Sequence, residues 1–133
     1  QGKRGGGSMS ALRRDVTDLG QVPQAVADLL KYARQQRGDE VHCYCVRLIL
    51  QELLVNACRY GGSGGASAWI RADAEGVDVM VMDDGRGFCL EKTLQRTGLL
   101  EESGRGLFLV QSICAGRMRQ NRRGNCIRVR FKG

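Results

Sequence analysis

The chain has 133 residues, 42% of them hydrophobic and 26% charged, and its formal net charge at pH 7 is +7. This length fits one domain that can bury a real core, and the composition is ordinary for a soluble globular protein. No apolar run reaches membrane-spanning length and no signal peptide is visible, so we expect a cytoplasmic protein with no membrane partner.

The first eight residues, QGKRGGGS, are typical of a cloning remnant, and we expect the native chain to begin at Met9. The domain assignment is therefore a remnant over residues 1–8 and a single domain over residues 9–133. Lys3 and Arg4 lie in the remnant, so the net charge of +7 falls to +5 without it. Such a basic balance suits a nucleotide, nucleic acid or an acidic protein partner. Nucleic acid is the weaker option, because no nucleic-acid-binding motif is recognisable and aromatic residues are few.

The six cysteines form no C-x-x-C pair, and four of them sit in apolar helical patterns. We therefore expect reduced core residues of a cytoplasmic protein, not a disulfide framework or a zinc site. The six are Cys43, Cys45, Cys58, Cys89, Cys114 and Cys126.

The N-terminal half predicts a short edge strand over residues 10–16 and then two helices. Pro23 opens the first helix, because proline fits the first turn of a helix. Apolar residues at helical spacing follow it: Val26, Leu29, Leu30 and Ala33. Gly38 is a good helix stop, and Asp39 can cap a second helix that ends near Tyr60.

The second helix carries Glu52 and Asn56, which are four residues apart and so lie on one face. The run around them, residues 48–58, is mostly apolar and predicts a buried helix. Both polar side chains need partners, because an unpaired buried polar group costs about 1–3 kcal/mol. The partners could be protein groups, which would make these a satisfied core glutamate and a helix-end asparagine. They could equally be a metal ion and a ligand.

Two alternating runs then predict a β-hairpin with a tight turn at residues 75–76. The inward residues of the two strands are Ala68, Ile70, Ala72, Ala74, Val77, Val79 and Val81. Asp83 continues this parity onto the helix-covered face, where a carboxylate needs a hydrogen-bonding ligand. In this register Trp69 faces Met82 and Arg71 faces Met80 on the outer side, with residue types that protein contact surfaces favour.

Two glycine-bearing segments follow the hairpin. Gly85 and Gly87 allow a sharp turn and close approach of a ligand. Residues 88–103 are polar and predict a loop with about one helical turn. Glycines at residues 104 and 106 lead into an apolar helix running to about Met118, whose N-terminus suits phosphate. Taken alone, each segment predicts only a loop and a helix start.

A last strand closes the sequence. Its inward residues are Ile127, Val129 and Phe131, and its outward residues are Arg128, Arg130 and Lys132.

Together, three motifs resemble the N, G1 and G2 boxes of the GHKL (histidine kinase-like) ATPase superfamily, which covers histidine kinases, gyrase, Hsp90 and mismatch-repair proteins. The motifs are Glu52-x-x-x-Asn56, Asp83-x-Gly85-x-Gly87 and Gly104-x-Gly106-Leu107. They occur in the right order on the right elements, and the resemblance spans residues 23–131. It implies an α+β, Bergerat-type two-layer α/β sandwich. In that fold a mixed, mostly antiparallel sheet carries three helices on one face, and ATP binds under a lid, here residues 88–103, that orders when the γ-phosphate is present.

The resemblance also assigns roles to residues. Asn56 would bind Mg²⁺ together with phosphate oxygens and waters, and Glu52 would orient or deprotonate an attacking hydroxyl. Asp83 would accept a hydrogen bond from the adenine amine. Arg59 would be a second phosphate contact or, equally, a solvated arginine at a helix end. The remaining residues assigned to nucleotide binding are Gly85, Gly87, Gly104, Arg105, Gly106 and Leu107.

Within the superfamily, the chain looks most like the stand-alone anti-sigma-factor serine/threonine kinases, in its size, its short lid and residues 104–110. This implies an ATP- and Mg²⁺-dependent kinase that phosphorylates an antagonist protein, sequesters a sigma factor, regulates transcription and pairs as a homodimer. The basic residues 115–123 depart from the acidic stretch that these kinases usually carry there, which leaves the partner open. His42 is expected to be structural.

Two alternatives stay open. One is the catalytic domain of a two-component histidine kinase, against which the start at Met9 and the edge strand argue. The other is a nucleotide-dependent binding module without phosphotransfer, against which the presence of both Glu52 and Asn56 argues.

Overall fold

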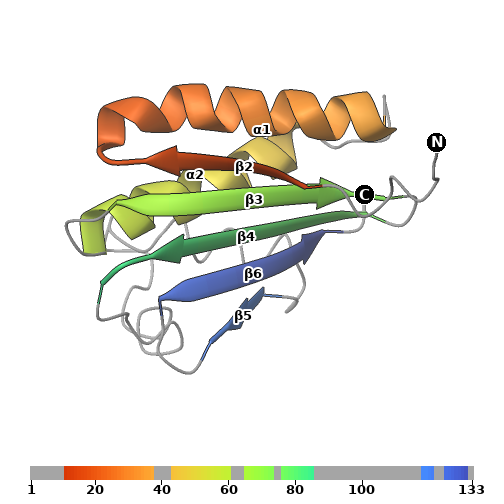
Figure 1. The fold of residues 1–133 in the computed structure, drawn as a ribbon. Coiled ribbons are helices and arrows are strands. Elements are labelled where there is room, and N and C mark those ends of the chain that lie inside the picture. The colour runs from red at the N-terminus through yellow and green to blue at the C-terminus, as the bar shows by residue number, and fades with distance from the viewer. Residues whose placement is uncertain are drawn as a thin grey trace, which may run out of the picture.

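Two helices pack on one face of a five-stranded sheet in the computed structural model, which describes residues 11–37, 43–60, 65–73, 76–85, 118–121 and 125–131 (Figure 1). The elements in chain order are β2 (Leu12–Val16), the 3-10 turn η2 (Leu19–Gln21), α1 (Val22–Arg37), α2 (Cys43–Tyr60), β3 (Ala66–Ala72), β4 (Val77–Asp83), β5 (Met118–Gln120) and β6 (Cys126–Phe131). The sheet order is β2-β3-β4-β6-β5, and each of these pairings is antiparallel.

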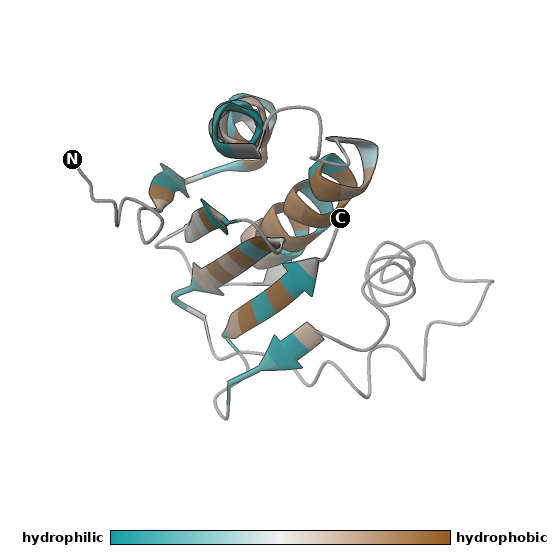
Figure 2. Ribbon diagram, turned by 90° about the vertical axis from the view of Figure 1, so that its right-hand side faces the viewer, coloured by the Kyte–Doolittle hydropathy of each residue, from teal (hydrophilic) through white to brown (hydrophobic). Residues whose placement is uncertain are grey.

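The core lies between the sheet and the two helices, because each element buries one side. Burial alternates strictly along β3 and β4, as expected of strands covered on a single face. Helix α1 contacts β2 and β3, while α2 contacts β3 and β4. Figure 2 shows both helices on the same side of the sheet, with hydrophobic and hydrophilic residues alternating along the strands. The largest fully buried side chains include Leu29, Ile49, Leu50, Leu53, Leu54 and Ile70.

Most of the expected architecture is confirmed. The α+β class and the two-layer arrangement are present, β2 is an edge strand, α1 begins beside Pro23, and α2 ends at Tyr60. Val77, Val79 and Val81 are buried as predicted. The described strands pair only antiparallel, so the parallel component of a mixed sheet is not found among them. The third helix, the lid, Gly38 and Asp39 lie outside the described residues.

The predicted hairpin register is wrong by two residues. Trp69 pairs with Met80 and Arg71 with Asp78, so the turn is centred one residue earlier than predicted. The Asp73 side chain accepts a hydrogen bond from the Gly76 amide at 3.0 Å, which fixes this turn. Because the shift is an even number, every residue keeps its predicted face.

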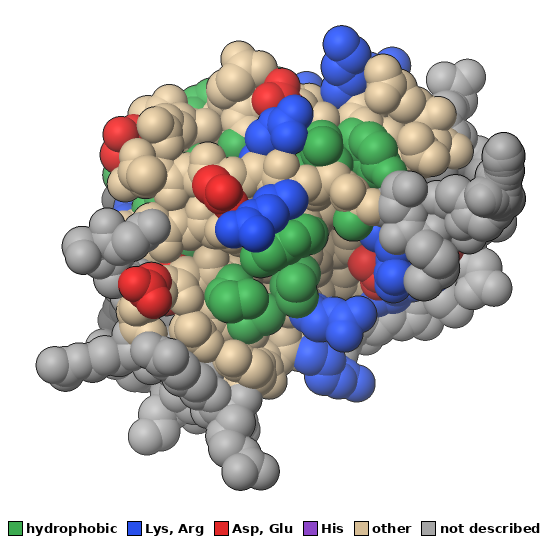
Figure 3. Space-filling view, viewed as in Figure 1, with side chains coloured by type: hydrophobic (Ala, Val, Ile, Leu, Met, Phe, Trp, Pro, Cys, Tyr) green, Lys and Arg blue, Asp and Glu red, His purple; other side chains and the backbone are tan. Residues whose placement is uncertain are grey.

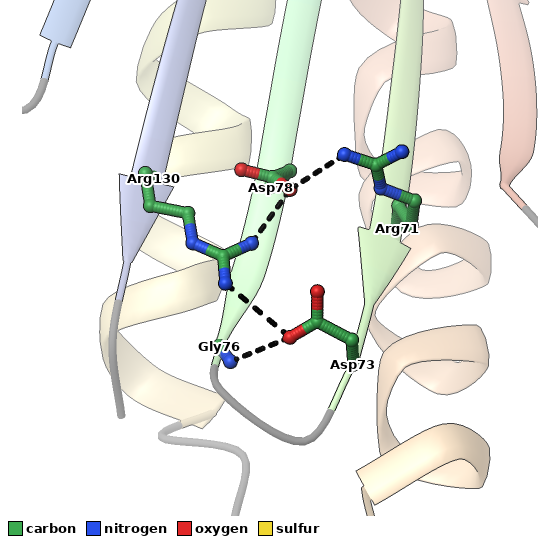
Figure 4. Close-up of polar contacts among 5 residues, drawn as sticks. All are labelled: Arg71, Asp73, Gly76, Asp78 and Arg130. Atoms are coloured by element: carbon green, nitrogen blue, oxygen red, sulfur yellow. Dashed lines mark hydrogen bonds and ion pairs between the residues drawn. The ribbon is translucent and has the colours of Figure 1, made fainter. Parts of the chain in front are cut away.

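Ion pairs on the uncovered face favour the observed register (Figure 4). Asp78 lies between Arg71 and Arg130, with N–O distances of 3.0 and 2.6 Å. Arg130 also reaches Asp73 at 3.3 Å. Burial opposes the charge of Arg130, but the hydrogen bond with Asp73 and the charges of Asp78 and Asp73 raise its pKa. The predicted register would have placed Met80 opposite Arg71 and broken this network.

Strand β5 was not predicted. Met118, where the third helix was expected to end, is the first residue of β5 and pairs with Val129. Met118 is buried and Arg119 is exposed, which is strand-like alternation.

Three described cysteines, Cys45, Cys58 and Cys126, are free thiols as predicted, but each is only partly buried. Burial raises the pKa of the Cys58 and Cys126 thiols.

Neither α1 nor α2, the α-helices of the described ranges, has the length and apolarity that crossing a membrane requires.

Candidate functional site

The C-terminal end of α2 and the end of β4 lie at the same end of the sheet (Figure 1). Tyr60, the last residue of α2, is separated by only the five residues 61–65 from Ala66, which pairs with Asp83. Asn56 on α2 is 7% exposed and Asp83 on β4 is 9% exposed. Two of the predicted site residues are therefore buried polar groups on neighbouring elements.

The side-chain amide of Asn56 is held through its nitrogen by the backbone of α2. Its Nδ2 donates a hydrogen bond to the Glu52 carbonyl oxygen, at 2.8 Å, one turn earlier. This bond sets the orientation of the amide and turns Oδ1 away from the helix backbone. No described residue donates to Oδ1. This oxygen is of the hard, neutral type that Mg²⁺ accepts.

Glu52 is half-buried on the same face of α2. Its carboxylate forms no ion pair or hydrogen bond with any described residue. A glutamate satisfied by core partners would show such contacts, so the described residues give no support to that alternative.

Asp83 has one carboxylate oxygen engaged. Its Oδ1 accepts a hydrogen bond from the buried Gly85 amide at 2.7 Å, which turns the chain sharply after β4. No described residue donates to the second oxygen. A buried carboxylate oxygen that receives no donor from the described residues fits a ligand that brings its own N–H donor.

Asn125 is the site residue that sequence analysis missed. The Asp83 amide donates to the Asn125 carbonyl oxygen, and Asn125 Nδ2 donates to the Asp83 carbonyl oxygen, both at 2.9 Å. The Asn125 side chain is itself buried. Its Oδ1 accepts a hydrogen bond from Nδ2 of Asn121 at 2.8 Å. Oδ1 of Asn121 accepts hydrogen bonds from the backbone N–H groups of Asn125 and Cys126. Two asparagines and a glycine between strands signal a turn, but nothing local signals the contact with Asp83.

Arg59 is exposed and lines a groove of about 510 Å³ between α1 and α2. The groove is mostly apolar, with Leu19, Val22, Val26 and Leu30 among its lining, and Arg47 also borders it. This location agrees with a solvated arginine at a helix end, and the phosphate contact stays a prediction. The remaining predicted residues, Gly87, Gly104, Arg105, Gly106 and Leu107, lie outside the described residues.

No curated protein matches the chain. A family model described as "Histidine kinase-like ATPase domain" matches residues 16–131, which begin at the last residue of β2 and include all later described elements. The two-layer fold and the buried polar residues at the ends of α2 and β4 agree with that match. The chain belongs to the histidine kinase-like ATPase domain family, of the GHKL type, and is an ATP-binding domain.

Proposed function

We propose that this protein is an ATP- and Mg²⁺-dependent serine/threonine protein kinase of the anti-sigma-factor type. It would phosphorylate a small antagonist protein and regulate transcription by sequestering a sigma factor. One observation carries the nucleotide site: the buried polar side chains of the described residues are Asn56, Asp83 and Asn125, and all three belong to the same end of the molecule. A core of this kind excludes polar groups unless they have partners or ligands.

Asp83 supplies the base-recognition contact. Its unused carboxylate oxygen accepts from the exocyclic amine of adenine, while guanine presents a carbonyl oxygen at that position and is repelled. Gly85, and Gly87 after it, keep the backbone free of side chains where the base lies.

Asn56 supplies the protein ligand for Mg²⁺ through Oδ1, with phosphate oxygens and waters completing the coordination. When bound, the ion neutralises charge on the transferring phosphate. The phosphates bind to Gly104, Arg105, Gly106 and Leu107, where the sequence predicts the start of a helix, and Arg59 is the less favoured second contact.

Glu52 supplies the base. Its carboxylate lies one turn from Asn56 and has no described partner, so it is available to orient and deprotonate a substrate hydroxyl. This availability favours catalysis over a binding module that lacks phosphotransfer.

Calorimetry of the Asp83→Asn variant tests the nucleotide site. The amide places donors opposite the adenine amine, so binding should weaken by about 1–3 kcal/mol, the scale of one unpaired buried polar group. Asp84→Asn is the matched control, because Asp84 is the exposed neighbour and carries the same chemical change. Equal ATP affinity in the two variants would remove Asp83 from this role.

Phosphotransfer is tested with γ-labelled ATP and a candidate antagonist protein. Label on a serine or threonine of the antagonist supports the kinase. ATP binding without transfer would make the protein a nucleotide-dependent binding module, and label on histidine would make it a histidine kinase domain.

A further inference from the structure

The face of the sheet opposite α1 and α2 is covered by no other described element (Figure 2). Side chains of β3 and β4 on this face are half-buried or exposed, in contrast to the buried side chains between them. Figure 3 shows apolar side chains gathered at the centre of this face with Lys and Arg side chains beside them. The open face is thus an exposed surface with its own composition.

The strand register arranges this surface in rows. Arg13 pairs with Trp69, Trp69 with Met80, Met80 with Arg128, and Arg128 with Arg119. One row across the sheet therefore places an aromatic–thioether pair between arginines. Arg13 stacks on the Trp69 ring, with its guanidinium carbon 4.9 Å from the ring centroid. Trp, Met and Arg are the residues enriched in protein–protein contacts.

A shallow hollow of about 270 Å³ lies over the middle of the row, with Trp69, Met80 and Arg128 among its lining. The hollow is large enough for one apolar side chain. It is bordered by charge, because Arg71 and Asp78 also line it.

Among the described residues of this face, arginines outnumber carboxylates. Its arginines are Arg13, Arg71, Arg119, Arg128 and Arg130, and its carboxylates are Asp15, Asp73 and Asp78. The carboxylates are already engaged, Asp15 by Arg13 at 2.9 Å and the other two by Arg71 and Arg130. Arg13 uses Nε for Asp15 and Nη2 for Ser67, and no described residue accepts from its Nη1. Arg128 is exposed and forms no ion pair with a described carboxylate.

We propose that the open face is a docking surface for an acidic segment of a partner protein, with one apolar residue in the hollow and a carboxylate on either side. Arg13 and Arg128 are three strand spacings apart, about 14 Å. An extended chain covers that span in about four residues. The matching pattern is therefore two acidic residues four apart, with an apolar residue between them.

Charge decides between this occupant and two others. A second copy would bring two arginine-rich faces together, and like charges in an interface are unfavourable. A single-stranded nucleic acid stacks successive bases on several aromatic side chains, and this face offers a single tryptophan.

The test uses the full chain and the peptide acetyl-Ser-Glu-Ser-Leu-Ser-Glu-Ser-amide. Trp69 is the only tryptophan in the sequence, so its fluorescence reports directly on this face. We expect saturable binding by the peptide, no comparable binding by the same peptide with lysine for glutamate, and loss of affinity by about tenfold in Arg128→Glu. Arg34→Glu, an exposed position on α1, is the matched control and should bind as the wild type does.

Several outcomes would overturn the proposal. Equal peptide binding by Arg128→Glu and Arg34→Glu would do so, as would equal binding of the lysine peptide. Tighter binding of a ten-nucleotide oligothymidine would make nucleic acid the occupant. A wild-type dimer in light scattering that Arg128→Glu dissociates would make a second copy the occupant. Arg128→Ser repeats the test if the charge reversal lowers the melting temperature. ATP affinity should stay unchanged in these variants, which separates this proposal from the nucleotide site.

Discussion

Replacing Asn125 with alanine tests whether the buried carboxylate of Asp83 depends on a residue 42 positions away in the chain. The substitution removes the 2.9 Å hydrogen bond from Asn125 Nδ2 to the Asp83 carbonyl oxygen and the 2.8 Å bond from Asn121. A typical hydrogen bond contributes about 0.5–1.5 kcal/mol, and a buried group left unpaired costs about 1–3 kcal/mol. The bond to the Asp83 carbonyl is buried, so its loss leaves an unpaired buried group, whereas Asn121 is exposed and can bond to water instead. We therefore expect the free energy of unfolding to fall by about 2–3 kcal/mol.

The assay pairs urea unfolding with calorimetric titration of ATP. If Asn125 positions Asp83, ATP affinity should also fall by about tenfold, which corresponds to about 1.4 kcal/mol. Gln35→Ala is the control, because Gln35 is an exposed amide on α1 and its loss should change stability by less than about 0.5 kcal/mol. A destabilised Asn125 variant that keeps wild-type ATP affinity would refute the positioning role. A variant with unchanged stability would refute the hydrogen-bond network itself.

Three further predictions follow. Glu52→Gln keeps the side-chain shape but removes the base, so phosphotransfer should fall about 10²–10⁴-fold while calorimetry still shows ATP binding; full transfer would exclude general-base catalysis by this residue. Asn56→Ala should weaken ATP binding in the presence of Mg²⁺ and leave the binding measured with EDTA unchanged. Equal losses of affinity with Mg²⁺ and with EDTA would exclude Asn56 as a metal ligand. Hydrogen bonds from Arg14 and Gln24 lower the pKa of Asp28. The ionised Asp28 therefore stabilises the fold at pH values above the usual carboxyl pKa, and this stabilisation is lost as the pH falls through the lowered pKa. Urea unfolding of Arg14→Gln should therefore converge with the wild type in strong acid, and a constant difference would contradict this pairing.

Residues whose roles follow from local periodicity could be predicted from the sequence. Asp83 continues the parity of Val79 and Val81, so its burial follows from the strand alone. The burial of Asn56 follows in the same way from the helical period of α2. Both predictions required only the identity of the face of the helix or strand that packs on the core.

Long-range contacts could not be predicted. A turn at residues 74–75 and one at 75–76 place the same side chains on the same faces, so alternation cannot choose between them. The choice depends on side-chain contacts at the turn, among them the hydrogen bond from Arg130 to Asp73 at 3.3 Å, whose positions are 57 residues apart. The hydrogen bond from Asn125 to Asp83 is non-local in the same sense, and β5 is too short for its alternation to stand out from a basic stretch.

Different contacts hold the two ends of β4 in register. At one end, Asp78 pairs with arginines of β3 and β6. At the other end, Asn125 holds the backbone of Asp83 on both its amide and its carbonyl. A slip of one residue would turn Asp83 onto the open face and Met82 into the core, so both contacts protect the candidate nucleotide site. Arg128 takes part in neither contact, and the register does not require its charge. The docking proposal therefore predicts that Arg128→Glu weakens peptide binding and leaves the strand register unchanged.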